Sequence, residues 1–283
     1  MQLLNILNRL ILVGFLFIGC SKSSSSQKEI AFYYWKSKCN ISKDFSYPLY
    51  IKVLDISTNS IIKTKCNKRK FTPVVYIDNH ALNKRNNIAQ IIFKTIPKNT
   101  KEVQFDCDWT SSTRQKYFKL LTLMKKHYAK ITATIRLHQL KYQTKTGIPP
   151  VDSGVLMFYN MSDFLNPNTK NYILDLDVAQ KYLRGFKSYP LQLDLALPIY
   201  SMATIFRYGK VVSLINGIKS NMLDNNFKKL SNNHYKVLKT HYFRGKLLYK
   251  NDELRVDEVS LEQLKKAIKM IPFEYHRIIF FHL

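Results

Sequence analysis

The chain has 283 residues, of which 46% are hydrophobic and 13% aromatic, a composition that predicts a packed core and excludes a largely disordered protein. Its 45 Lys and Arg against 19 Asp and Glu give a net charge of +26. The lysines are spread along the whole sequence rather than gathered in a patch, which argues against nucleic acid as a partner and leaves anionic lipid or acidic glycan open.

The N-terminal segment, residues 1–19, is predicted to be a signal peptide. It carries one charge, Arg9, ahead of an apolar run from Leu10 to Ile18 that is too short to span a bilayer. The following "LFIGC" resembles the lipobox of bacterial lipoprotein signals, in which the cysteine, here Cys20, carries the lipid. We therefore expect residues 20–29 to be a flexible tether and the protein to be lipid-anchored to the bacterial cell envelope, at the outer membrane. A plain secretory signal or a membrane stub is the alternative.

Eight β-branched and aromatic runs follow, and each is predicted to be a strand. They lie at residues 31–37, 49–57, 72–78, 102–109, 131–139, 154–161, 191–199 and 277–283.

Helical periodicity separates several of these strands. Thr110–Thr113 offer caps for a helix with an apolar stripe from Tyr117 to Tyr128, and Ser260 with Gln263 forms a capping box before another. Two more helices are expected over residues 83–93 and 175–183.

Eight strands that alternate with helices predict a parallel (β/α)8 barrel, and residues 30–283 are close in number to the roughly 250 typical of this fold. The first helix is expected to be degenerate because its segment is short and contains Pro48, and the final helix is expected to be missing. Residues 201–259 are predicted to be an insertion with a β-ribbon. An open α/β sheet is the rival architecture.

Alternation along the strands predicts which side chains face the barrel interior. Leu193 and its neighbours should face outward against the helices, whereas Gln104, Asp106, Asp108, Arg136, His138 and Asp194 should point inward. Because buried carboxylates need partners, Asp106, Asp194 and Arg136 are expected to satisfy one another or to meet a wet cavity. Asp108, His138, Tyr159 and Asn160 fall near the carboxyl ends of strands, where barrel active sites lie.

The remaining cysteines are assigned by context. Cys107 lies in a strand and is expected to be buried, whereas Cys39 and Cys66 lie in polar sequence and could pair in an oxidising compartment. No Cys or His spacing indicates a metal site, and no cofactor is expected.

Two strand ends carry a family resemblance. "VQFDCDW" (residues 103–109) and "LMFYNM" (156–161) are similar to the DxxDxDxE and M-x-Y-[DN] motifs of family 18 glycoside hydrolases, the chitinases and endo-N-acetylglucosaminidases. These enzymes are (β/α)8 barrels. Almost the entire chain after the signal also resembles an uncharacterised group of bacterial barrel lipoproteins.

The resemblance implies roles for four residues. Asp106 and Asp108 match the aspartates that position and polarise the N-acetyl group of the substrate and are the candidate catalytic residues. Tyr159 matches the tyrosine that hydrogen-bonds that group, and Asn160 its neighbour. The position of the general acid holds Thr110, and the position of the first motif aspartate holds Val103.

If the protein hydrolyses glycosides, another carboxyl must therefore supply the proton. Asp108 is the first candidate; Asp152 should lie at the opposite barrel end, and Glu258 belongs to the insertion. The aromatic residues Trp35, Trp109, Tyr159 and Tyr200 are candidates for stacking on sugar, with core packing as the alternative.

The sequence thus predicts an envelope lipoprotein with a glycoside-hydrolase-like barrel that hydrolyses or processes N-acetylated glycans. Trp35, Trp109, His138, Tyr159, Asn160 and Asp194 are its candidate substrate-binding residues. A non-catalytic glycan-binding or structural envelope protein is the alternative function.

Overall fold

The structure, a computed structural model, describes residues 28–42, 44–66 and 70–282. The predicted signal peptide, Cys20 and most of the tether lie outside the described residues. Within the described part, no helix is long and apolar enough to cross a membrane.

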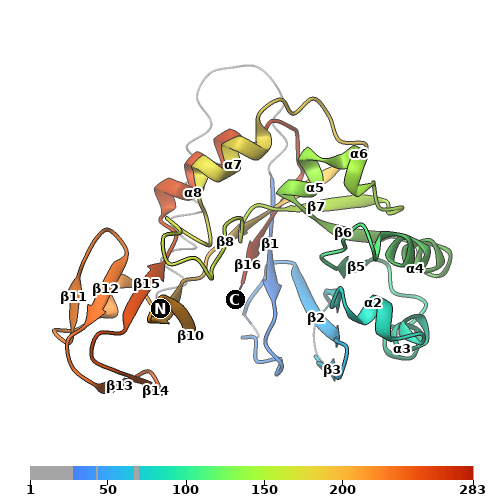
Figure 1. The fold of residues 1–283 in the computed structure, drawn as a ribbon. Coiled ribbons are helices and arrows are strands. Elements are labelled where there is room, and N and C mark those ends of the chain that lie inside the picture. Colours follow the sequence, from blue (N-terminus) through green and yellow to red (C-terminus); the bar gives the residue numbers. More distant parts are fainter. Residues whose placement is uncertain (1–27, 43, 67–69, 283) are drawn as a thin grey trace.

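Eight parallel strands close into a barrel, as the sequence predicts (Figure 1). In spatial order they are β1 (Glu29–Tyr34), β2 (Leu49–Ile56), β4 (Thr72–Ile77), β5 (Val103–Asp106), β6 (Ile131–Arg136), β7 (Ser153–Met157), β8 (Leu193–Pro198) and β16 (Arg277–Phe281). The sheet closes because β1 pairs in parallel with both β16 and β2. This closure excludes the open α/β sheet.

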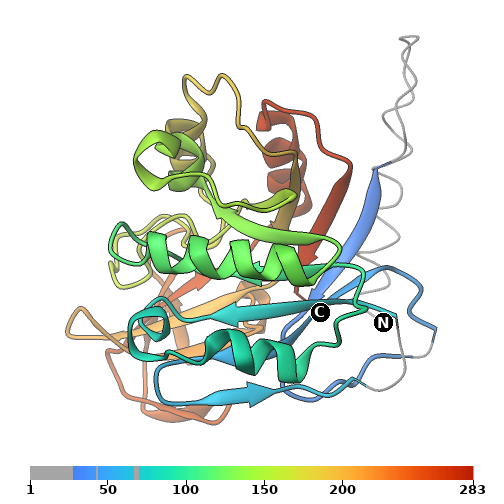
Figure 2. The same cartoon turned by 90° about the vertical axis from the view of Figure 1, so that its right-hand side faces the viewer.

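The helices lie outside the barrel, and Figure 2 shows two of them, α3 and α4 (teal and green), running alongside the strands that they cover. They are α2 (Ala81–Lys84), α3 (Ile88–Thr95), α4 (Arg114–His127), α5 (Leu137–Lys141), α6 (Gln143–Thr146), α7 (Leu176–Leu183) and α8 (Leu261–Met270). The predicted helix over residues 83–93 is in fact two helices, α2 and α3, with a break between them. No helix occurs among the described residues between β1 and β2, as expected.

The segment between β8 and α8 folds as a separate antiparallel sheet, which we call the insertion (residues 202–257; Figure 1, orange). Its strands run in the order β10 (Lys210–Asn216), β9 (Met202–Arg207), β15 (Glu253–Asp257), β12 (His234–Val237) and β11 (Phe227–Lys229). A hairpin of β13 (His241–Phe243) and β14 (Lys246–Leu248) and a short 3-10 helix, η1 (Ser220–Met222), complete it. The short strand β3 (Ile61–Lys63) pairs antiparallel with β2 at the barrel.

Two hydrophobic cores result. The larger lies in and around the barrel and includes Val103, Phe105 and Cys107, the outward half of the predicted alternation. The smaller belongs to the insertion and contains Ile205, Val237 and Leu254. The disulfide between Cys39 and Cys66, with 5.3 Å between their Cα atoms, ties the helix-free β1–β2 connection to the segment that precedes β4.

Candidate functional site

Polar side chains fill the barrel interior on the face that alternation assigns to them. Gln104 is fully buried and accepts a hydrogen bond of 2.6 Å from the Tyr33 hydroxyl. Two residues further along β5, Asp106 is 3% exposed and accepts a 2.6 Å hydrogen bond from the Thr134 hydroxyl on β6. The interior therefore becomes a ladder of hydrogen-bonded groups that leads toward the carboxyl ends of the strands, the mouth of the barrel.

An arginine and an aspartate form an ion pair at the mouth. Arg136 donates through Nε and Nη2 to the two carboxylate oxygens of Asp108, at 2.5 and 2.6 Å. The Asp108 side chain is 51% exposed, so a ligand can still reach its oxygens. The fork geometry of guanidinium fixes the carboxylate plane, which makes Asp108 a preorganised acceptor.

Asp106 lies beside this pair with an altered acidity. Burial and the charge of Asp108 raise the pKa of Asp106 to about 6, although Arg136 and the hydrogen bond from Thr134 act in the opposite direction. Near neutral pH a small fraction of Asp106 is therefore protonated, which an ordinary aspartate would not be.

Asp194 does not take part in this group. It accepts a hydrogen bond of 3.0 Å from the backbone N–H of Arg277, the first residue of β16, and so lies at the amino ends of the strands. The expected mutual pairing of Asp106, Asp194 and Arg136 is thus replaced by two separate clusters: Arg136 pairs with Asp108, and Asp194 lies near Arg277. Since barrel ligands bind at the opposite end, this position argues for a stabilising role.

The end of β7 supplies Tyr159 and Asn160. Tyr159 is 2% exposed, its ring stacks on that of Phe281 at 5.0 Å, and its hydroxyl has no hydrogen-bond partner among the described residues. Burial raises the pKa of Tyr159, so the hydroxyl stays protonated and can donate. Asn160 has φ 52°, and its Oδ1 accepts a hydrogen bond from the Tyr200 hydroxyl.

Aromatic rings surround Phe281 at the end of β16. The ring centroids of Trp35, Tyr33 and Tyr200 lie 5.4, 5.9 and 5.6 Å from that of Phe281. Trp35 is partly exposed, its Nε1 lacks a partner among the described residues, and Lys52 Nζ lies 4.7 Å from its ring centre. The sequence analysis missed Phe281, although its place at the end of the last strand is the signal that could have identified it.

Trp109 lies elsewhere. It is 3% exposed, stacks on Tyr117 of α4 at 5.3 Å and donates from Nε1 to the backbone oxygen of Thr146. The structure therefore places Trp109 in the layer between strands and helices, where core packing, the alternative stated above, accounts for it.

His138 is exposed in α5, because β6 ends at Arg136 instead of continuing to residue 139. It lines a small cavity of about 70 Å³ together with Arg136, Tyr159, Asn160 and Tyr182. Burial and the charge of Arg136 lower the pKa of His138, so it is neutral at neutral pH.

Thr110 is the residue at the position where the resemblance places the general acid. Thr110 is exposed, and its hydroxyl exchanges hydrogen bonds with Ser112 and Thr113 in the turn before α4. Asp152 accepts from the backbone N–H of Ile131, at the amino end of β6, as expected. Glu258 accepts from the hydroxyl of Ser220 at 2.6 Å. Of the candidate acids, Asp108 is thus the one that is paired with Arg136.

Within the described residues, no three His, Cys, Asp or Glu side chains gather in a way that could hold a metal ion. The site therefore consists of carboxylates, one arginine, phenols and aromatic faces.

No family model matches the chain, and no curated protein matches it in sequence. Solved structures do match in fold. The Bacillus cereus spore cortex-lytic enzyme SleL has a TM-score of 0.51 at 12% identity, over 90% of this chain and 70% of that one. The class V chitinase from Nicotiana tobaccum has a TM-score of 0.50 at 12% identity, over 90% and 94% of the two chains.

A GH18 chitinase from Cycas revoluta, solved in complex with (GlcNAc)4, has a TM-score of 0.50 at 10% identity, over 90% of this chain and 94% of that one. At these identities the likeness concerns the fold. The chain is therefore a (β/α)8 barrel similar in architecture to the barrels of chitinase-like glycoside hydrolases.

Proposed function

We propose that the mouth of the barrel binds a glycan that contains N-acetylated amino sugars. The observation that carries this proposal is the Tyr159 hydroxyl, which is buried, protonated and without a hydrogen-bond partner among the described residues. Leaving such a donor unpaired costs about 1–3 kcal/mol, which a ligand carbonyl would recover. An acetamido group offers that carbonyl oxygen as an acceptor, and its N–H can donate a hydrogen bond to the Asp108 carboxylate.

Apolar surface at the mouth supports a sugar ligand. Phe281, on which the Tyr159 ring stacks, is in contact with two further aromatic rings. Its ring centroid lies 5.4 Å from that of Trp35 and 5.6 Å from that of Tyr200. Sugar rings expose C–H faces that pack on aromatic rings while their hydroxyls meet polar groups. The Cycas revoluta chitinase of similar fold holds (GlcNAc)4.

The function that this site supports best is glycan binding, without hydrolysis by the route of the family 18 glycoside hydrolases. Thr110 stands where the resemblance places the general acid, and a hydroxyl cannot protonate a leaving oxygen near neutral pH. Among the described residues, Asp108 is the carboxylate that hydrogen bonds join to Arg136, and Asp106 is the carboxylate whose pKa the charge of Arg136 lowers.

Hydrolysis is the second candidate function, and the acidity of Asp106 is the observation that favours it. A carboxyl with a pKa of about 6 is suited to donate a proton near neutral pH. Its 3% exposure and its hydrogen bond from Thr134 limit its access to a glycosidic oxygen.

Calorimetric titration with the GlcNAc tetramer tests the binding proposal. Tyr159→Phe removes one hydroxyl and should weaken binding about five- to tenfold, as expected for one hydrogen bond. The matched control is Tyr117→Phe, because the Tyr117 hydroxyl is equally buried and unpaired but lies against Trp109, away from the mouth. The proposal fails if wild type does not bind, or if both variants bind as wild type does.

Release of reducing ends from the same oligomers separates the two candidate functions. A purified protein lacking residues 1–20 should bind without release. Release that disappears in Asp106→Asn would instead establish the hydrolase.

We also propose that the protein is held at the cell envelope by lipid on Cys20, in line with the "LFIGC" sequence. Metabolic labelling with a fatty-acid analogue should modify wild type and not Cys20→Ser, and the variant should leave the membrane fraction. Unchanged membrane retention of Cys20→Ser would contradict the proposal.

A further inference from the structure

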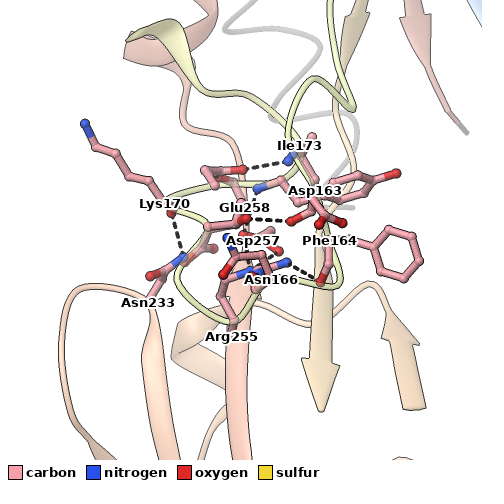
Figure 3. Close-up of polar contacts among 12 residues, drawn as sticks. Asp163, Phe164, Asn166, Lys170, Ile173, Asn233, Arg255, Asp257 and Glu258 are labelled. Carbon is pink, nitrogen blue, oxygen red and sulfur yellow. Dashed lines mark hydrogen bonds and ion pairs between the residues drawn. The ribbon is translucent and has the colours of Figure 1, made fainter. Parts of the chain in front are cut away.

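The loop between β7 and α7 (residues 158–175, the β7–α7 loop) reaches both the mouth and the insertion. It carries Asn160 at its start and Tyr172 near its end. Figure 3 shows the polar contacts between this loop and the insertion. None of these contacts follows from the sequence patterns, which offered only Glu258 of the predicted insertion as a candidate acid.

A buried ion pair in β15 is the centre of these contacts. Arg255 and Asp257 are both 0% exposed, and Nε of Arg255 lies 2.9 Å from Oδ2 of Asp257. The guanidinium also donates to two backbone oxygens of the loop, that of Asn166 at 2.7 Å and that of Phe164 at 3.3 Å (Figure 3). Arg255 thus binds the loop through its main chain, independently of the side chains that the loop carries.

Further bonds fasten the end of the loop. Oδ1 of Asp257 accepts from the backbone N–H of Tyr172 at 3.1 Å. Asn171 donates from Nδ2 to the backbone oxygen of Glu258, the residue after β15, at 3.0 Å. Asn233 of the insertion donates to the backbone oxygen of Lys170 at 3.0 Å.

From there an unbroken series of hydrogen bonds leads to the mouth. Oδ1 of Asn171 accepts from the backbone N–H of Ile173 at 2.9 Å, and the backbone oxygen of Ile173 accepts from the backbone N–H of Asn160 at 2.8 Å. Asn160 in turn accepts from Tyr200 through its side chain. Asn160 has a left-handed backbone, φ 52°, which costs energy for a residue with a side chain and persists where neighbouring contacts hold it.

Tyr172 is next to Ile173, whose backbone oxygen binds Asn160, and its side chain packs against the barrel core. Burial raises the pKa of its hydroxyl, and the charges of Arg136 and Asp108 act on it as well. Its ring also packs edge-on against Phe164, with centroids 5.6 Å apart. The insertion therefore fixes the backbone of the residue that carries this phenol.

We propose that Tyr172 is a ligand-contacting residue of the mouth and that Arg255 and Asp257 are positioning residues that hold Tyr172 and Asn160 there. The proposal rests on the proposed glycan binding. It makes the β7–α7 loop one wall of the binding site and the insertion its support, so a change in β15 alters affinity without touching the ligand.

Arg255→Lys is the variant that tests the positioning role. Lysine keeps the charge that Asp257 requires but lacks the planar fork that reaches two loop carbonyls. Amide hydrogen exchange in residues 163–174 should rise about tenfold or more, and binding of the GlcNAc tetramer should weaken about fivefold. Tyr172→Phe should weaken binding to a similar extent with no change in exchange.

Arg207→Lys is the matched control. Arg207 also binds an aspartate of the insertion through two nitrogens, donating to Asp252 at 2.8 and 2.8 Å, but makes no contact with the β7–α7 loop in the described structure. Its variant should leave loop exchange and affinity unchanged. If Arg255→Lys does not fold, Asp257→Asn replaces it, since an asparagine retains an acceptor for the Tyr172 N–H.

Unchanged exchange of the loop in Arg255→Lys and Asp257→Asn would overturn the positioning role. Unchanged affinity in Tyr172→Phe would overturn the ligand contact. Wild type that binds no N-acetylated oligosaccharide would overturn the proposed function and with it the ligand contact, whereas the exchange experiment would still decide whether Arg255 holds the loop.

Discussion

At the scale of single residues, strand alternation predicted which side chains face the barrel interior. It did not predict which of these side chains bind one another. Gln104 and Asp106 point inward because successive side chains of a strand must alternate. Which partner each meets depends on the stagger of neighbouring strands, which the sequence does not reveal. Arg136 therefore pairs with Asp108, and Asp194 lies near Arg277 at the other end.

Two further residues show the limits of local patterns. Alternation places Trp109 on the same outward face as Val103, Phe105 and Cys107, and its burial against α4 agrees with this. Its place near a strand end had instead suggested a contact with sugar. Tyr172 comes from a loop, where no periodicity exists, and its backbone N–H is held by Asp257 of the insertion.

The raised pKa of Asp106 predicts a specific pH dependence of stability. Between the ordinary pKa of aspartate and a pH of about 6, the folded state binds more protons than the unfolded state. The contribution of Asp106 to the free energy of unfolding therefore falls as the pH rises through this range. Asp106→Asn stays neutral and keeps an acceptor for Thr134. From pH 4 to pH 7 the free energy of unfolding of wild type should therefore fall by about 2–3 kcal/mol relative to that of Asp106→Asn.

Urea denaturation of both proteins across this range provides the measurement. Comparison of the two cancels the titration of groups that they share. A difference that does not vary with pH would mean that Asp106 titrates normally.

At the scale of secondary structure, the capping box before α8 formed as predicted, whereas Thr113, the N-cap of α4, makes no side-chain capping hydrogen bond. The predicted box of Ser260 and Gln263 is present, with Ser260 Oγ accepting from the Gln263 N–H at 3.2 Å. By contrast, the stripe over residues 83–93 is divided at Arg85, where the chain extends and α2 ends. A stripe records which residues are apolar, and a cap records where a helix begins.

The disulfide is the element-scale feature with the largest expected energy. It closes a loop with a sequence separation of 27, across a connection that has no helix among its described residues. In the chain-entropy account such a loop contributes about 3–4 kcal/mol. Replacing Cys39 and Cys66 by serine should lower the free energy of unfolding by about this amount.

Thermal and urea unfolding of the double variant, with and without reductant, would measure this effect. Reduced wild type should match the variant, and reductant should not affect the variant. If reductant leaves the stability of wild type unchanged, the disulfide does not contribute to folding.

At the scale of the whole molecule, the number and order of strands were enough to predict a closed barrel. Eight strands with intervening helices can bury both faces of a parallel sheet by closing it, and β1 pairs with β16 accordingly. What the sequence could not supply is the contact between the insertion and the β7–α7 loop, because Arg255 meets main-chain oxygens that lie 89 and 91 residues away in the sequence.

The two ends of the barrel should respond differently to mutation. At the amino end, Arg277 of the closing strand donates to Glu29 at 2.6 Å and to the Tyr50 hydroxyl. Arg277→Met should lower the free energy of unfolding by about 1–3 kcal/mol and leave glycan binding unchanged. Arg136→Met, at the mouth, should weaken binding because it frees the Asp108 carboxylate to rotate.

Denaturation curves and calorimetric titrations of the two variants would separate stability from binding. Loss of binding in Arg277→Met that remains folded would contradict this division of roles between the two ends.

The buried pair of Arg255 and Asp257 has a consequence for how this protein can evolve. Losing either partner leaves an uncompensated charge in a fully buried place, at a cost of about 3–5 kcal/mol, a large part of the stability of an ordinary domain. Single-step intermediates are therefore penalised, and the two positions should be inherited as a unit. Relatives that share the insertion are expected to carry both residues or neither, and those with neither should differ in the β7–α7 loop as well.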